Sequence, residues 1–78
     1  MRNIEIFWRP NCKFCEMAKN LLSSKGIDYT LKEIGVDISV EYFKMVNPNI
    51  KTVPAIFVDS IYIGGYTELK EMVDNGDI

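Results

Sequence analysis

The chain has 78 residues, a net charge of −2, and two cysteines but no histidine. Its length suits a single domain spanning residues 1–78. Two cysteines are too few for a disulfide-rich secreted scaffold, and the acidic balance argues against a nucleic-acid-binding surface. Residues 1–5 contain no apolar signal core and no segment approaches membrane-spanning length, so we expect a cytoplasmic protein without a membrane partner.

The first part of the chain predicts a β–α–β unit. Residues 4–8 are apolar and rich in strand-forming types. Residues 13–24 carry apolar side chains at helical spacing, and Gly26 follows as a helix stop. Residues 27–33 read as a second strand. Because a helix connects the two strands, we expect them to lie parallel.

A second, shorter helix is predicted after residue 39. Ser39 is a candidate N-cap, since its hydroxyl can accept a hydrogen bond from the first turn. Val40, Phe43 and Val46 would share one face of this helix. The dipeptide Asn47-Pro48 ends it, because a residue before proline avoids the helical conformation.

The last part predicts a hairpin and a closing helix. Residues 55–58 and 61–63 read as strands joined by a tight turn. Residues 67–73 form the last helix, which ends near Asn75-Gly76. The expected fold class is therefore α/β with the order βαβαββα, a four-stranded mixed sheet flanked by helices.

Both cysteines, Cys12 and Cys15, lie at the junction between the first strand and the first helix. A zinc site needs four ligands, and here there is no histidine and no carboxylate at ligand spacing, so we expect no metal. The lack of histidine also excludes Cys–His proteases. Two buried thiols without a function are one remaining interpretation, because free cysteine is often buried. A redox-active pair is the other.

The redox interpretation explains the spacing. Two residues three apart at a helix start lie on one face, with Cys12 outermost and Cys15 one turn further in. Unpaired N–H groups of the first turn point toward the Cys12 sulfur and can stabilise its thiolate. The helix dipole contributes ~0.3–1 kcal/mol, less than the ~1.4 kcal/mol of one pKa unit, so direct hydrogen bonds must dominate. Lys13 and Arg9 add a smaller electrostatic contribution.

Four sequence blocks together make the chain resemble a glutaredoxin. They are residues 6–9 leading into Cys12-Lys13-Phe14-Cys15, the helix end at 21–26, Thr52-Val53-Pro54, and residues 64–69 (GGYTEL). A CxxC motif alone is a weak signal, but the four blocks in this order cover essentially the whole chain. The resemblance implies a thioredoxin-like fold and the reduction of disulfides and glutathione mixed disulfides, with glutathione as the reducing co-substrate.

The resemblance also implies roles for single residues. Cys12 matches the nucleophile and Cys15 the resolving thiol. Arg9 matches a position usually held by lysine, which meets the glycine carboxylate of glutathione, and Lys51 matches a basic residue near the same carboxylate. Phe14 matches an aromatic residue beside the binding groove, although the helical pattern alone also allows a core aromatic.

The remaining matches form the rest of the expected glutathione site. The Val53–Pro54 bond is expected to be cis and to face the cysteines, so that the main chain of Val53, which follows Thr52, can pair with a cysteinyl substrate as a strand would. Gly64-Gly65 would let the backbone approach the γ-glutamyl end. The main chain of Tyr66 and Thr67, with the Thr67 hydroxyl and the helix start, would hold its carboxylate.

The chain departs from the family pattern at Lys13, where many dithiol glutaredoxins have proline. Two alternatives therefore stay open. One is a dimer that binds a [2Fe–2S] cluster with the help of glutathione, and the other is a thioredoxin-like hydrogen donor, for example to ribonucleotide reductase, that a flavoenzyme reduces. Arg9, Phe14 and Thr67 favour the glutathione-dependent enzyme. We expect a monomer whose partners are glutathione and disulfide-containing or glutathionylated proteins.

Overall fold

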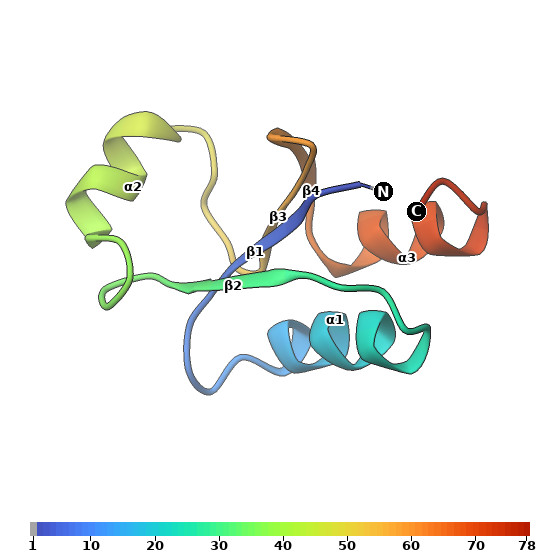
Figure 1. Ribbon diagram of the computed structural model, residues 1–78. Helices are drawn as coiled ribbons and strands as arrows, with labels where there is room; N and C mark the ends of the chain where they lie inside the picture. The colour runs from blue at the N-terminus through green and yellow to red at the C-terminus, as the bar shows by residue number, and fades with distance from the viewer. Residues whose placement is uncertain (1) are drawn as a thin grey trace.

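A computed structural model describes residues 2–78 and has the predicted order of elements (Figure 1). The elements are β1 (Ile4–Trp8), α1 (Lys13–Ser24), β2 (Thr30–Glu33), α2 (Val40–Val46), β3 (Ala55–Val58), β4 (Ile61–Gly64) and α3 (Tyr66–Asp74). The sheet order is β2-β1-β3-β4, with β2 parallel to β1 and the other two pairs antiparallel. The mixed four-stranded sheet is confirmed. Within residues 2–78, no helix is long and apolar enough to cross a membrane.

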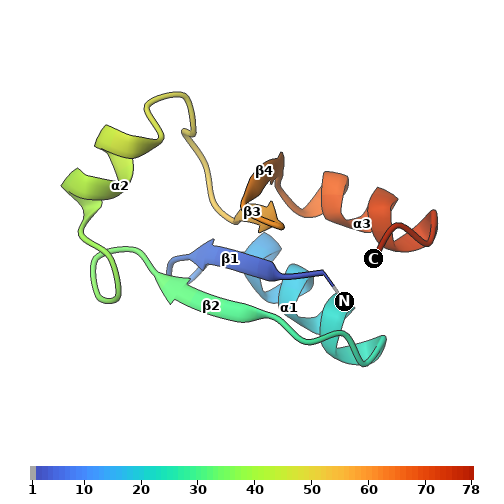
Figure 2. The same ribbon diagram turned by 45° about the horizontal axis from the view of Figure 1, so that its top comes forward.

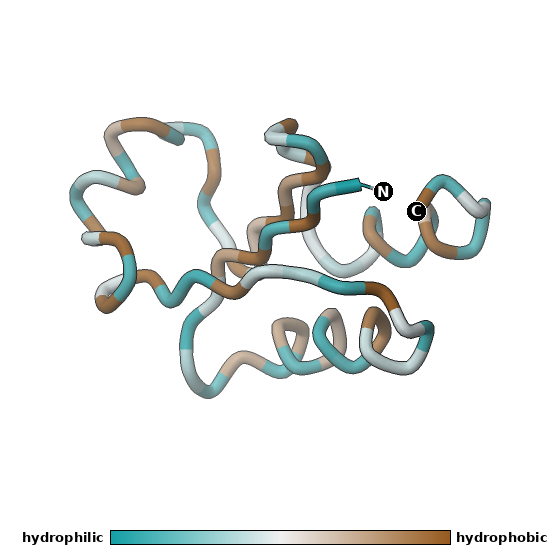
Figure 3. Tube along the Cα trace, viewed as in Figure 1, coloured by the Kyte–Doolittle hydropathy of each residue, from teal (hydrophilic) through white to brown (hydrophobic). Residues whose placement is uncertain are grey.

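Alternation along the strands divides the core between the two faces of the sheet. Ile4 and Ile6 point to one face, where they meet Leu22 of α1 and Leu69 of α3. Phe7 points to the other face. Because α1 and α3 cover the first face and α2 the second, α1 and α3 lie side by side while α2 lies apart from both (Figure 2). Each helix packs only one side against the sheet, so hydrophilic and hydrophobic residues alternate along the helices (Figure 3).

The second face has a smaller, aromatic core. The ring of Phe7 lies 5.1 Å from that of Phe43 in α2 and 5.4 Å from that of Phe57 in β3, measured between centroids. Ile34 and Ala55 complete the buried cluster. This core anchors α2, and it lies directly behind the loop that leads from α2 to β3.

Two sequence predictions need correction. The strand predicted over residues 27–33 begins only at Thr30, because the N–H of Ile27 is bonded to the carbonyl of Leu22 and still belongs to the turn that ends α1. Val46 does not share the buried face of Phe43. It is 54% exposed, because it lies in the last turn of α2 beside an open groove that Tyr42 also lines.

The turn of the hairpin is tied to the start of β1. Asp59 and Ser60 both have positive φ angles, 52° and 69°, as a two-residue hairpin turn requires. The Asp59 carboxylate accepts hydrogen bonds from the N–H of Asn3 at 2.8 Å and from Arg2 Nε at 3.1 Å. These two contacts, the backbone one first, lower the pKa of Asp59. The turn between β3 and β4 is therefore fixed to the residues that precede β1.

Truncating one buried leucine tests this packing. Leu22 is 0% exposed, so Leu22→Ala is expected to lower the free energy of unfolding by about 2–5 kcal/mol, through lost burial and a residual cavity. Leu31 in β2 is 37% exposed, and Leu31→Ala is the matched control, expected to cost only about 0.5 kcal/mol. Urea titration of the oxidised proteins followed by circular dichroism measures both. Equal losses would contradict the assigned core.

Candidate active site

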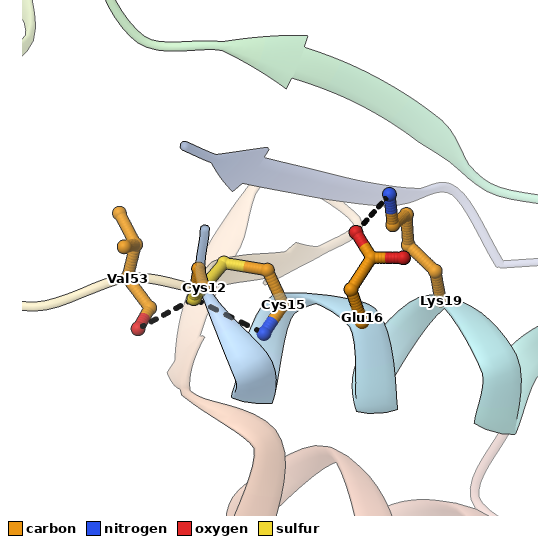
Figure 4. Close-up of a disulfide and its surroundings, with 5 residues drawn as sticks. All are labelled: Cys12, Cys15, Glu16, Lys19 and Val53. Atoms are coloured by element: carbon orange, nitrogen blue, oxygen red, sulfur yellow. Dashed lines mark hydrogen bonds and ion pairs between the residues drawn. A yellow bond between two sulfur atoms is a disulfide. The ribbon is translucent and has the colours of Figure 1, made fainter. Parts of the chain in front are cut away.

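The two cysteines form a disulfide where β1 leads into α1 (Figure 4). Cys12 is the N-cap of α1 and has an extended backbone, with φ −114° and ψ 107°. This conformation turns its side chain back over the helix start, where the N–H of Cys15 donates a hydrogen bond to Cys12 Sγ at 3.2 Å. The predicted contact between the first turn and the Cys12 sulfur is confirmed for one N–H group, that of Cys15.

The two sulfurs differ in accessibility. Cys15 is 0% exposed, whereas Cys12 is partly exposed, so of the two residues only Cys12 is open to solvent. Lys19 holds the next turn of α1 against β1, since its Nζ lies 4.5 Å from the centre of the Trp8 ring and 2.6 Å from the Glu16 carboxylate. The helix that carries both cysteines is thus anchored immediately after them.

The loop that leads from α2 to β3 contacts Cys12. The Val53–Pro54 peptide bond is cis, which confirms the expectation drawn from the resemblance. The carbonyl oxygen of Val53 lies 3.7 Å from Cys12 Sγ and would accept a hydrogen bond from the reduced thiol. This places an open stretch of main chain, which belongs to no strand, next to the accessible sulfur.

Gly64 and Gly65 allow the connection between β4 and α3 to pack against the cis-proline loop. A Cβ on Gly65 would lie 3.4 Å from the carbonyl oxygen of Pro54, so the backbone there packs close to the cis-proline loop. Gly64 has φ +124°, and a Cβ on it would lie 2.6 Å from the Glu68 carboxylate. That carboxylate accepts a hydrogen bond from the N–H of Gly65 at 2.8 Å and caps α3. The β4–α3 connection is therefore fixed against Pro54.

A cavity of about 660 Å³ lies between these segments. It brings together most of the residues predicted to bind glutathione, namely Phe14, Thr52, Val53, Pro54, Gly65, Tyr66 and Thr67. Phe14 is 54% exposed, with its ring centre 6.2 Å from that of Tyr66. The interpretation of Phe14 as a core aromatic is therefore wrong.

Arg9 and Lys51 line a different cavity. Its volume is about 140 Å³, and it shares only Thr52 and Val53 with the first. Both cations are exposed, and Lys51 Nζ donates a hydrogen bond to the carbonyl of Pro48 at 2.9 Å. The predicted site residues thus fall into two groups, one on each side of the Thr52-Val53 main chain.

Three further residues line the larger cavity and were not predicted, namely Tyr62, Ile63 and Glu68, whereas Gly64 was expected there together with Gly65. Glu68 is the third residue of α3 and bonds back to the N–H of Gly65, which is half of a capping box; because Gly65 has no side chain to form the other half, the sequence signal for Glu68 was incomplete. Lys13 is exposed at the first position of α1. Among residues 2–78, no group of three or more His, Cys, Asp or Glu side chains is arranged to hold a metal ion.

Comparison with known proteins defines the class of this site. Residues 4–63 match the sequence pattern of the glutaredoxin family. Glutaredoxin 3 of Escherichia coli is 33% identical over 78 residues, covering 100% of this chain and 94% of that protein. A glutaredoxin of Neisseria meningitidis is 32% identical over 80 residues, covering 100% and 93%.

Solved structures agree with these sequence relatives. Glutaredoxin 1 from Francisella tularensis, solved as a complex with cacodylate, superposes with a TM-score of 0.76 at 29% identity, covering 96% of this chain and 95% of that one. Reduced E. coli glutaredoxin superposes with a TM-score of 0.73 at 33% identity, covering 97% and 99%. The chain belongs to the glutaredoxin family. It is a glutathione-dependent disulfide oxidoreductase, and its redox pair is Cys12 and Cys15.

The geometry predicts which reduced thiol ionises first. We expect Cys12 to have the lower pKa, because the Cys15 N–H bonds to its sulfur and Cys15 itself is buried. Iodoacetamide labelling of the reduced protein at pH 6, followed by peptide mapping, should find the label on Cys12. Lys13→Ala is the control, and it should raise the Cys12 pKa by well under one unit, because a solvated charge contributes little. Preferential labelling of Cys15, or a shift of two units in the variant, would contradict this ranking.

Proposed function

We propose that the protein reduces glutathione mixed disulfides and protein disulfides, with Cys12 as the nucleophile and glutathione as the electron donor. The observation that carries the proposal is the position of Cys12 Sγ. It is partly exposed, accepts a hydrogen bond from the α1 backbone, and lies beside the main chain of Val53. We place the reaction in the cytoplasm, where reduced glutathione is available.

Glutathione would bind across the Thr52-Val53 main chain. Its cysteinyl residue pairs with the backbone of Val53, as an added strand does. The γ-glutamyl end enters the larger cavity, beside Gly65, where the Tyr66 and Thr67 amides at the start of α3 favour its carboxylate. Phe14 covers one side of this cavity.

The glycine carboxylate would point the other way. Arg9 and Lys51 line the smaller cavity and carry the positive charges that suit a carboxylate. The two ends of glutathione are thereby assigned to two separate cavities, and the sulfur to the main chain between them. This assignment uses all the predicted binding residues except Pro54, which lines the larger cavity without an assigned contact.

Removal of glutathione from a substrate needs one thiol. The Cys12 thiolate attacks the glutathione sulfur of the mixed disulfide, a bond forms between these two sulfurs, and the substrate leaves as a thiolate. A second glutathione thiolate then attacks the bound glutathione sulfur. Glutathione disulfide forms and Cys12 leaves as the thiolate, which a low thiol pKa favours.

Reduction of a protein disulfide needs both thiols. The Cys12 thiolate attacks one substrate sulfur and expels the other as a thiolate. Cys15 loses its proton and attacks Cys12 Sγ, which forms the intramolecular disulfide and releases the second substrate thiolate. Two molecules of glutathione then restore the dithiol and leave as glutathione disulfide. Disulfide-containing proteins such as ribonucleotide reductase are the proposed clients, and the protein acts as a monomer.

Separate replacement of the two cysteines distinguishes the routes. Cys15→Ser should retain much of the glutathione-linked turnover of a small mixed disulfide, yet become trapped on a protein disulfide, because no thiol remains to attack Cys12. Cys12→Ser should abolish both activities, since Cys15 is buried. Coupled assays with glutathione and glutathione reductase measure the turnover. If Cys15→Ser stayed folded but lost both activities, a hydrogen donor reduced by a flavoenzyme would replace the proposal.

Expression with ample iron tests the cluster-binding alternative. We expect colourless monomer after purification without oxygen, because the charged Lys13 side chain is exposed next to the Cys12 sulfur that would hold a cluster. Iron and sulfide analysis with size-exclusion chromatography measures the outcome, and Lys13→Pro provides a comparison with the common family pattern. Stoichiometric iron and sulfide in a brown dimer would contradict the expectation.

A further inference from the structure

The smaller cavity has an apolar lining that the glycine carboxylate of glutathione would not contact. Beyond its cations and the Thr52-Val53 main chain, it is lined by four apolar side chains: Ile34, Val40, Phe43 and Ile50. Ile34 and Phe43 belong to the buried aromatic core, so they form a fixed floor. The glycine of glutathione has no side chain. Glutathione therefore leaves this apolar part of the cavity unfilled.

The rim of the same cavity carries a third cation. Besides Arg9 and Lys51, Lys44 of α2 lines it, and none of the described residues that line this cavity is acidic. Lys44 is exposed. Three cations around an apolar floor suit a ligand segment that combines a large apolar side chain with a carboxylate close to it.

We infer that this cavity is a side-chain subsite for protein substrates. It accepts a large aliphatic or aromatic residue directly after the substrate cysteine, with a carboxylate beyond that residue, from an acidic side chain or a chain terminus, near Lys44. The inference rests on the proposed function, which places the glycine end of glutathione on this side. It specifies the sequence around the substrate cysteine that the enzyme prefers.

Continuity and size support this occupant over others. The cavity shares Thr52 and Val53 with the larger one, so a peptide paired with the Val53 main chain directs its next residue into it. A volume of about 140 Å³ suits one side chain and is too small for a helix or a second domain. Its floor lies behind the loop from α2 to β3, so the same buried cluster supports both the loop and the subsite.

Single-turnover kinetics of the Cys15→Ser variant test the subsite. The substrates are blocked peptides of sequence Gly-Cys-Leu-Glu, Gly-Cys-Gly-Glu and Gly-Cys-Leu-Lys, each joined through its cysteine to 5-thio-2-nitrobenzoate. The Cys12 thiolate attacks the peptide sulfur, the Cys12–peptide disulfide forms, and the thionitrobenzoate anion leaves with the bonding electrons. Its colour reports the second-order rate constant, because Cys15 is absent and cannot resolve the product.

The leucine peptide is expected to react about tenfold faster than the glycine peptide, because its side chain fills an apolar pocket. Replacing glutamate with lysine in the peptide should slow the reaction about threefold, as exposed charge pairs allow. Similar rates for all three peptides would overturn the subsite while leaving the proposed function intact. Failure of every peptide to release thionitrobenzoate would overturn both.

Two variants, each with a control, test whether this cavity is the source of the preference for leucine and glutamate in the peptide. Val40→Phe fills the cavity and should bring the leucine-to-glycine rate ratio close to one, whereas Val36→Phe, at a position 72% exposed and outside the cavity, should not change it. Lys44→Glu should reverse the preference for glutamate over lysine. Lys25→Glu makes the same charge change at the far end of α1 and should leave that preference unaltered. Rate ratios unaffected by Val40→Phe and Lys44→Glu would overturn the inference.

Discussion

The position of Cys12 at the N-cap of α1 is the constraint on which the site depends. An N-cap side chain accepts a hydrogen bond from the first turn, and serine or aspartate usually does this with oxygen. Here the acceptor is Cys12 Sγ, with the Cys15 N–H as donor. The interaction that begins the helix is therefore also the interaction that stabilises a thiolate. Because Cys15 lies one turn further in, the same geometry buries the second sulfur and keeps it within reach of the first.

Stability and reactivity are coupled through this contact. A hydrogen bond to a thiolate sulfur stabilises the charged form relative to the neutral thiol. A disulfide sulfur accepts hydrogen bonds less strongly than a thiolate. The start of α1 is thus best capped when Cys12 has been expelled as a thiolate, which favours its departure from mixed disulfides.

The sequence predicted the fold well where local patterns decide it. β1 and α1 have the predicted bounds, because an apolar run, a turn and a helical repeat follow one another without conflict. The predicted start of β2 was wrong, because the N–H of Ile27 donates to the carbonyl of Leu22 at the end of α1. The alternation of residue types does not show this hydrogen bond. Val46 was misplaced for a similar reason, since helical spacing does not show where the sheet stops covering a helix.

The residues predicted to bind glutathione all line at least one of the two cavities, but their division between two cavities was not predicted. Arg9 follows β1 and Lys51 precedes β3, and only the pairing of those two strands brings them to one cavity. Phe14 and Thr67 line the other cavity because α1 and α3 pack together on the opposite face. The sheet therefore separates the two cavities: each face carries its own core, and each core supports one cavity. The cis-proline loop lies where the two faces meet, so the main chain of Val53 is shared by both cavities and can present the substrate sulfur to Cys12.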